Sequence, residues 1–352
     1  MKEICMRAAG LLASAAMSTF GGWVAFQFGL PLAWLIGSAL VCAGLSLSLG
    51  APTVPRRLYR GGQVVVGVSV GLTVDASVFD RIGLHLYLVP LIAGISILLG
   101  RAMVPLLVRA GNIDRSTAFF ALVPAGISEM ADLAQTKGAD TGVVTTLHAA
   151  RVFLVVCILP VVIYHLGDPL LLAAGRPQGV WDLPLLLALA AGTASAVAGN
   201  WLGLPSAFIV GSMVGVAALS AVGALSASEP TPLLAAAQVI LGLSLGARFR
   251  RATVRRLPRA LTAGMAVLVL NGLVMAMVGL SLAAMFGLDP STMLLSSATG
   301  GTAEMVLTAQ AVAVDAALVA LYQVMRGLGG NLMAGRIHAW TVTGPDCSRR
   351  NP

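Results

Sequence analysis

The chain has 352 residues, of which 58% are hydrophobic and 10% are charged, and its mean hydropathy is +0.91. Because a soluble protein carries about 25% charged residues, this composition excludes a set of soluble domains. The formal charge of +8 comes mostly from arginines at the ends of apolar segments, a pattern that reports membrane topology and does not indicate nucleic-acid binding. The sequence therefore predicts an all-α polytopic membrane protein.

Twelve apolar segments follow one another along the chain, six in each half. We expect the first to be a retained span, because no cleavage site with a polar mature segment follows it. The segments of the first half are 7–28, 31–50, 61–79, 84–108, 116–136 and 141–165, and those of the second half are 183–202, 205–225, 232–248, 258–286, 291–313 and 316–340.

The two halves of the chain resemble each other in sequence at an offset of about 175 residues. In the longest matching stretch, 11 of 38 positions are identical, and all four charged residues of the second copy fall on the same residue in the first. Chance apolar similarity would not align four charges, so we predict two structural repeats of about 170 residues. The matching stretches are Leu30–Val41 with Leu204–Gly215, Gln63–Gly71 with Gln238–Gly246, and Asp114–Arg151 with Asp289–Arg326.

Arginines mark opposite ends of corresponding segments in the two halves. The loop at 51–60 carries three arginines while its counterpart in the second half carries none, and the loop at 248–259 carries six while its counterpart carries one. Cytoplasmic loops are rich in arginine and lysine, so the two repeats are expected to have opposite orientations. Opposite orientation requires an odd number of membrane crossings in each repeat.

The fifth segment of each half carries helix-breaking residues at its centre, in Pro124–Gln135 and in Thr299–Gln310. Such a segment is the natural candidate for a hairpin that enters and leaves on the same side. We therefore predict two inverted-topology repeats, each with five transmembrane helices and one Gly-broken re-entrant hairpin. The expected divisions are 1–166 for the first repeat, 167–182 for an extracytoplasmic linker, 183–341 for the second repeat and 342–352 for a cytoplasmic tail.

Several of these stretches resemble the membrane AbrB family, which is distinct from the DNA-binding regulator of the same name. They are Gly21–Trp23, the LPLAWLIG that begins at Leu30, Gln63–Gly71 and the paired SEM and AEM of the broken segments. The resemblance covers essentially the whole chain and implies a multi-pass protein of the bacterial inner membrane, with both termini cytoplasmic. Family labels include regulator of aidB expression and ammonia monooxygenase. The hairpin pattern also resembles glutamate- and citrate-type transporters.

The residues argue against both family labels as direct activities. An oxygenase needs clustered metal ligands, but the four histidines (His85, His148, His165 and His338) are dispersed. A DNA-binding regulator needs a soluble or basic domain, and no soluble stretch exceeds about 15 residues. We therefore expect no enzymatic activity, no structural metal and no nucleic-acid partner.

Glu129 and Glu304 are the leading candidates for a solute or ion site, since ionisable residues within apolar segments are costly and need partners. Each follows a helix break, where free backbone N–H groups suit an anion or a carboxylate. The alternative is a structural kink in which each glutamate caps its helix. Further residues expected to line the tips are Gly126, Ser128, Gly300, Gly301 and Thr302.

Arg151 and Arg326 lie in the middle of the sixth segment of each half. We expect them either to contact an anionic solute or to form structural bridges with the two glutamates. Weaker candidates are Asp140 and Asp315 on the same helical face, His148, whose counterpart is Gln323, and Gln135 with Gln310. Asp114 and Asp289 are expected to cap helices, and Arg248–Arg259 to set orientation and contact anionic lipid.

These features favour a secondary active transporter of a small, anionic organic solute that works by alternating access. The carboxylates would carry a coupling Na⁺ or H⁺, and no other cofactor is expected. The alternatives are a passive channel and a membrane sensor that affects gene expression indirectly. The partners would be the lipid bilayer and a small solute, and a homodimer is compatible with the fold analogy.

Overall fold

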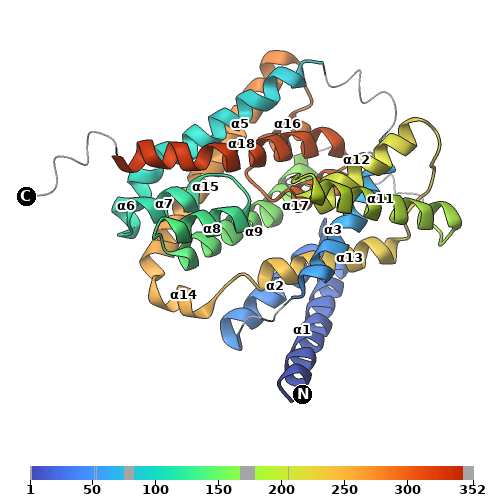
Figure 1. Cartoon of the computed structure of the whole chain (residues 1–352), viewed down its shortest axis with the longest axis horizontal. Helices are drawn as coiled ribbons and strands as arrows, with labels where there is room; N and C mark the ends of the chain where they lie inside the picture. Colours follow the sequence, from blue (N-terminus) through green and yellow to red (C-terminus); the bar gives the residue numbers. More distant parts are fainter. Residues whose placement is uncertain are drawn as a thin grey trace, which may run out of the picture.

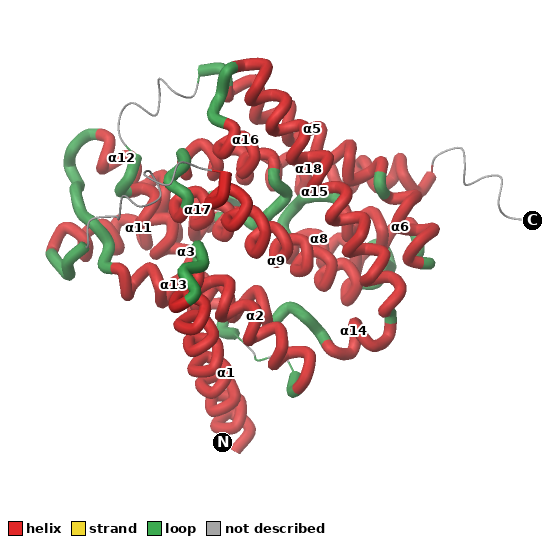
Figure 2. Tube along the Cα trace, turned by 180° about the vertical axis from the view of Figure 1, so that it is seen from behind, coloured by secondary structure: helices red, strands yellow, loops and turns green. Residues whose placement is uncertain are grey.

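The computed structural model describes residues 2–50, 52, 54–74, 83–166, 179–204 and 206–343, and these residues form helices and connecting loops without a strand (Figure 2). Large apolar side chains such as Phe20, Tyr87, Trp201 and Leu202 are exposed on the outer helices, as expected for lipid contact. Helices long and apolar enough to cross a membrane are found at His85–Gly111, Thr141–Tyr164, Leu183–Trp201, Thr231–Arg256 and Pro258–Phe286.

The helices pack into two bundles that draw on both halves of the chain (Figure 1). We call them the first and the second bundle, and the short helix α14 (Arg251–Arg256) connects them. The first bundle contains α1 (Lys2–Gln27), α2 (Ala33–Ser48), α3 (Arg56–Gly71), α11 (Leu183–Trp201), α12 (Ala207–Ala221) and α13 (Thr231–Gly246). The second contains α5 (His85–Ala102), α6 (Val104–Gly111), α7 (Arg115–Leu122), α8 (Ile127–Thr136), α9 (Thr141–Leu166), α15 (Pro258–Phe286), α16 (Pro290–Ser297), α17 (Thr302–Ala311) and α18 (Ala316–Thr343).

Glycines let the helices of the first bundle approach closely, and the same contact occurs twice. On α3, a Cβ at Gly67 would overlap the hydroxyl of Ser212 on α12. On α13, a Cβ at Gly242 would overlap the hydroxyl of Ser38 on α2. The two glycines are 175 residues apart and the two serines 174 apart. Each interface therefore joins a helix of one half to a helix of the other half.

Both segments predicted to be broken consist of two short helices in the second bundle. Helices α7 and α8 have 8 and 10 residues and are separated by residues 123–126, and α16 and α17 have the same lengths and are separated by residues 298–301. At a rise of about 1.5 Å per residue, none of the four can cross a hydrocarbon core of about 30 Å. The predicted breaks are confirmed, whereas a re-entrant course stays a prediction.

The start of α9 and the end of α18 meet beside the start of α7. The backbone N–H of Asp140, just before α9, donates to the Thr117 hydroxyl at 2.8 Å. The neighbouring Ser116 hydroxyl lies 2.9 Å from Nε2 of His338, near the end of α18. The first broken segment therefore returns to the place where it began. The start of α9 therefore lies close to the end of α18.

Three boundaries differ from the sequence-based prediction. The segment predicted at 84–108 is divided at Met103, because Pro105 in the first turn of α6 starts a new helix. The loop predicted between the third and fourth segments of the second half contains the extra helix α14. The third segment ends as a helix at Gly71 rather than at residue 79. Residues 75–82, most of the predicted linker (167–178) and the tail from residue 344 lie outside the described residues.

Candidate functional site

Arg326 on α18 binds the backbone carbonyls that the second helix break leaves free. Its Nη1 donates to Ala298 O at 2.7 Å and its Nη2 to Gly300 O at 3.3 Å. Gln323, one turn earlier, donates to Leu295 O at 3.0 Å and to Ala298 O at 3.1 Å. The last four carbonyls of a helix have no partner within it, so these two side chains complete the end of α16.

The first break is bound in the same way from α9. Nε2 of His148 donates to Phe120 O at 2.7 Å, and Nη1 of Arg151 donates to Leu122 O at 3.4 Å. Phe120 corresponds to Leu295, so both breaks receive donors at the same position. The polar groups of both α9 and α18 thus hold a helix end in an otherwise apolar core.

The difference between His148 and Gln323 is conservative in hydrogen bonding. Nη2 of Arg151 donates to Nδ1 of His148 at 3.0 Å, while Arg326 donates to the side-chain oxygen of Gln323. His148 therefore gives one hydrogen bond to a carbonyl and Gln323 gives two, and each accepts one from an arginine. A neutral imidazole with its proton on Nε2 and an amide both meet this requirement.

The charges of the two arginines are not balanced by a paired carboxylate. Arg151 is 5% exposed and Arg326 is 3% exposed, and their guanidinium groups lie close enough to interact electrostatically. Within the described part of the chain neither forms an ion pair, so the expected bridges to Glu129 and Glu304 do not form. The two guanidinium groups donate instead to the backbone carbonyls that the breaks leave free. Nε of Arg151 is buried and has no hydrogen-bond partner.

Glu129 and Glu304 occupy the first turn of α8 and α17, where the positive end of a helix favours a carboxylate. Each side chain folds back over the glycine that precedes its helix, and a Cβ at Gly126 or Gly301 would overlap it. Their surroundings differ, because Glu304 is 6% exposed and therefore buried, whereas Glu129 is exposed. Thr302 begins α17, and the side chain of Ser128 lies outside the described residues.

Helix α18 also touches the first break, through two residues that the sequence did not single out. Oδ1 of Asn331 accepts a hydrogen bond from the backbone of Gly126 at 3.2 Å. A Cβ at Gly330 would overlap the carbonyl oxygen of Pro124. Helix α18 therefore holds both breaks, one with Arg326 and the other with Asn331. A polar residue beside a glycine in an apolar helix was the available signal.

Arg248 is the other functional candidate that sequence reasoning missed. It was expected to face lipid or the membrane surface, but it is partly buried at the end of α13 and its guanidinium carbon lies 5.8 Å from the centre of the Tyr59 ring. This distance allows a cation–π interaction. Arg248 also interacts electrostatically with Glu304 and His148. The first bundle thus places a positive charge near the second helix break, the one before Glu304.

Four aspartates cap helices and lie away from the two arginines. Asp114 and Asp289 accept from Thr117 N at 2.7 Å and from Thr292 N at 2.6 Å, which confirms them as capping residues. Asp140 and Asp315 were expected in the site, but their carboxylates accept from backbone groups in the first turns of α9 and α18. Three helical turns, or about 16 Å, separate each from the arginine that follows it.

Gln310 and Gln135 also have different surroundings. Nε2 of Gln310 donates to the hydroxyl of Ser69 on α3 at 2.9 Å, and that hydroxyl lies 2.6 Å from Oε1 of Glu229. Gln310 is buried, while Gln135 is exposed at the end of α8. The structure therefore brings Gln310 into a polar cluster between the bundles and leaves Gln135 outside one.

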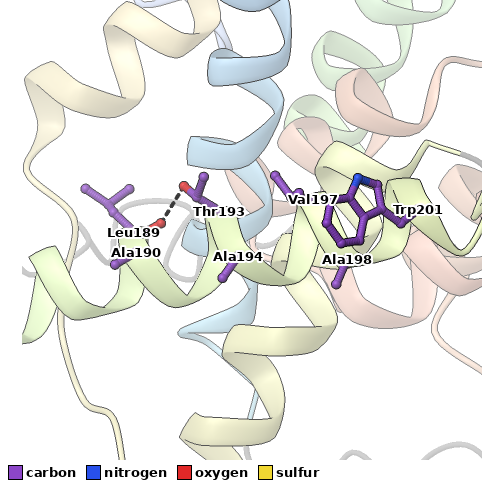
Figure 3. A pocket seen from close by; sticks show the side chains of 7 residues that line it. All are labelled: Leu189, Ala190, Thr193, Ala194, Val197, Ala198 and Trp201. Carbon is purple, nitrogen blue, oxygen red and sulfur yellow. Dashed lines mark hydrogen bonds between the residues drawn. The ribbon is translucent and has the colours of Figure 1, made fainter.

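An open groove of about 700 Å³ lies along an exposed face of α11 (Figure 3). Its lining residues carry no charge, and the hydroxyl of Thr193 donates to Leu189 O at 2.7 Å. Such a surface offers no charged group that could bind an ion. Among the described residues, no three His, Cys, Asp or Glu side chains come together as a metal site would require.

Comparison with known proteins gives matches over most of the chain. The family model described as "Transition state regulatory protein AbrB" matches residues 34–338. "Uncharacterized protein YhjN" of Bacillus subtilis (strain 168) is 28% identical over 341 residues, which cover 88% of each chain. "Putative regulator AbrB" of Escherichia coli (strain K12) is 27% identical over 312 residues, which cover 84% of this chain and 86% of that protein. The range that the family model matches contains both helix breaks and both buried arginines.

Proposed function

Because this chain belongs to the AbrB family of integral-membrane proteins, we propose that it is a secondary active transporter that moves a small organic anion across the bacterial inner membrane. The main support is a buried positive centre. Arg151 and Arg326 come from two helices, lie near each other and have no paired carboxylate among the described residues. A buried charge without a counter-charge is costly, and an anionic solute would supply one. The proposal includes no enzymatic step and no bound cofactor.

In this proposal the two broken segments are re-entrant hairpins of inverted repeats. Four helices of 8 or 10 residues are too short to span the membrane singly. The contact between Thr117 and the backbone of Asp140 supports a first segment that leaves on the side where it entered. Two observations support two inverted copies. The end of α18 lies beside the start of α9, and the contacts of Gly67 and Gly242 are paired.

The two bundles would move against each other during transport. The second bundle carries both breaks and both buried arginines, while the first contributes Arg248 and Tyr59 to the same region. A solute held at this boundary would become accessible to one side and then to the other as the bundles shift. The interaction between Arg248 and Glu304 would join the bundles when no solute is bound.

Glu129 and Glu304 would bind the coupling Na⁺ or H⁺. Each lies in the first turn of a helix that begins at a break. Among the described residues, neither carboxylate forms an ion pair with an arginine. In a coupled cycle the carboxylate takes up the cation while the arginines hold the anion, so that the loaded site is closer to neutral. This neutralisation lowers the cost of moving both across an apolar barrier.

The test is solute uptake by protein reconstituted into proteoliposomes. Radiolabelled anions would be selected from carboxylates, phosphates and sulfonates that raise the thermal stability of the purified protein. We expect accumulation driven by an inward H⁺ or Na⁺ gradient. A Glu129→Gln/Glu304→Gln variant should fold, lose gradient-driven accumulation and keep exchange of solute between equal compartments. Asp132→Asn, an exposed change one turn from Glu129, is the matched control.

Three outcomes would contradict the proposal. Normal ion-coupled uptake by the double glutamine variant would remove the glutamates from the mechanism. Downhill flux without accumulation would indicate a channel. Binding of an anion without any flux would indicate a sensor, the role suggested by the regulator name of the Escherichia coli relative.

A further inference from the structure

Corresponding residues of the two halves differ in their solvent exposure in this structure. In the second half Glu304 is 6% exposed and Gln310 is 7% exposed, whereas their counterparts Glu129 and Gln135 are both exposed. The four residues belong to the two broken segments, and each pair has the same residue type at an offset of 175. Sequence identity at these positions therefore does not explain the difference, which comes from how each segment packs on the first bundle.

The second broken segment is fastened to the first bundle by three polar side chains. Gln310 on α17 donates to Ser69 on α3 at 2.9 Å, and Ser69 donates to Glu229 at 2.6 Å. Ser69 is fully buried, and Glu229 lies in the loop that leads into α13. These hydrogen bonds close the boundary between the bundles on the side of loop 222–230.

The corresponding contact of the first broken segment is not made. The counterpart of Ser69 is Ser244 on α13, and the counterpart of Gln310 is Gln135 on α8. No hydrogen bond joins Ser244 to Gln135 within the described residues, and Gln135 is exposed. The first broken segment begins and ends near α14, where Arg256 approaches Asp140 to 4.0 Å. On the arginine-rich side, the described residues therefore show no counterpart of the hydrogen bond between Gln310 and Ser69.

We propose that this structure is one of two alternating states, each closed by one of two related gates. In the present state, Ser69, Gln310 and Glu229 close the site on the side of loop 222–230. In the other state, Ser244 and Gln135 close it on the side of α14, and the contact between Ser69 and Gln310 is broken. This inference rests on the proposed alternating-access function. Inverted repeats that exchange conformations give each half, in turn, the packing that the other half has now.

The two gates differ in strength because only one contains a carboxylate. Pro55 precedes α3 as Pro230 precedes α13, so the residue at the position of Glu229 in the first half is Val54. A hydrogen bond to a carboxylate is roughly twice as strong as one between neutral groups. The state closed by Glu229 is therefore favoured at rest. Replacing Glu229 with Gln should move the population toward the other state.

Cross-linking of paired cysteines tests this alternation in the full chain, reconstituted into liposomes without solute. All four native cysteines would first be replaced. One variant carries Ser69→Cys/Gln310→Cys, a second carries Ser244→Cys/Gln135→Cys, and a control carries Ser244→Cys/Thr136→Cys on the next residue of α8. A short bis-methanethiosulfonate reagent should link the first pair rapidly. It should link the second pair at least tenfold more slowly, yet well above the control.

A variant with all four gate cysteines tests whether the gates exclude each other. Mass spectrometry should find either link, but not both in the same molecule. Adding Glu229→Gln to the Ser244→Cys/Gln135→Cys variant, in which Ser69 and Gln310 are native, should raise the rate of the second link several-fold. The inference is overturned if the second pair links no faster than the control, if both links form together, or if Glu229→Gln leaves the rate of the second link unchanged. If the two links exclude each other but no solute flux is found, the two gates are supported and the transport function is rejected. If flux is found but both links form together, the gates are rejected and the transport function is not.

Discussion

At the scale of single residues, the partners of Arg151 and Arg326 are determined by the helix breaks. Each break frees backbone carbonyls, and a guanidinium group with several donors in one plane can bind them from a neighbouring helix. The aligned charges in the sequence single out both arginines and both glutamates as matched pairs. They do not predict the carbonyl partners, because any residue type supplies a carbonyl and its position depends on where the helix stops.

The pairing of His148 with Arg151 makes a specific substitution tolerable. Because Gln323 makes equivalent hydrogen bonds beside Arg326, His148→Gln should leave thermal stability close to wild type. His148→Ala should destabilise the protein by about 1–3 kcal/mol, since it leaves Phe120 O and an arginine donor unpaired in the core. Thermal unfolding in detergent measures both. Gln323→His and Gln323→Ala form the matched pair in the other half. Equal destabilisation by His148→Gln and His148→Ala would contradict the equivalence.

At the scale of helices, close packing at small residues connects the two halves in the first bundle. The matched stretches around Leu30 and Gln63 identify these helices from sequence. They also predict that each helix occurs once in each half. The partner choice was not predictable in the same way. Gly67 packs on α12 and Gly242 on α2, so each helix pairs with one from the other half. Sequence periodicity assigns a face to a helix but does not say which distant helix covers that face.

Gly67 is expected to be sensitive to even a single added methyl group. In Gly67→Ala the new Cβ would overlap the Ser212 hydroxyl and force α3 away from α12, which should cost about 1–3 kcal/mol. The control is Gly61→Ala on the same helix, where a Cβ would meet no atom within 4 Å. We expect Gly61→Ala to be neutral or slightly stabilising, because alanine favours a helix over glycine. A similar loss of thermal stability in both variants would show that α3 and α12 do not approach at Gly67.

The helix α14 shows why the arginine cluster could be interpreted only in part from sequence. The arginines of residues 248–259, on this helix and beside it, were expected to serve orientation and lipid contact. In the structure Arg251 donates to Ser48 O at 2.7 Å, and Arg259 donates to Ala110 O at 3.0 Å. These carbonyls lie at or near the ends of α2 and α6, one in each bundle. The cluster therefore also ties helix ends together, which depends on contacts between residues about 150 to 200 positions apart.

At the scale of the whole molecule, the proposed arrangement has the two broken segments approach the central arginines from opposite faces. The first begins and ends near α14, and the second ends beside Glu229 in loop 222–230. Counting arginines in the sequence predicts this opposition, because an odd number of crossings inverts the second copy. The sequence could not predict which of two related boundaries is closed, since both copies carry the same serine and glutamine.

The opposition of the two faces gives the last prediction. On a background without native cysteines, Ser226→Cys in the exposed loop before α13 should react with a membrane-impermeant maleimide added outside cells. Arg255→Cys on α14 should react only in inside-out vesicles. Arg109→Cys and Lys137→Cys flank the first broken segment and are both exposed, so they should behave like Arg255→Cys if that segment is re-entrant. Labelling of Arg109→Cys and Lys137→Cys from opposite sides would show that α7 and α8 cross the membrane as one broken span. Labelling of Ser226→Cys and Arg255→Cys from the same side would instead remove the inverted arrangement, because α13 would then not separate two compartments.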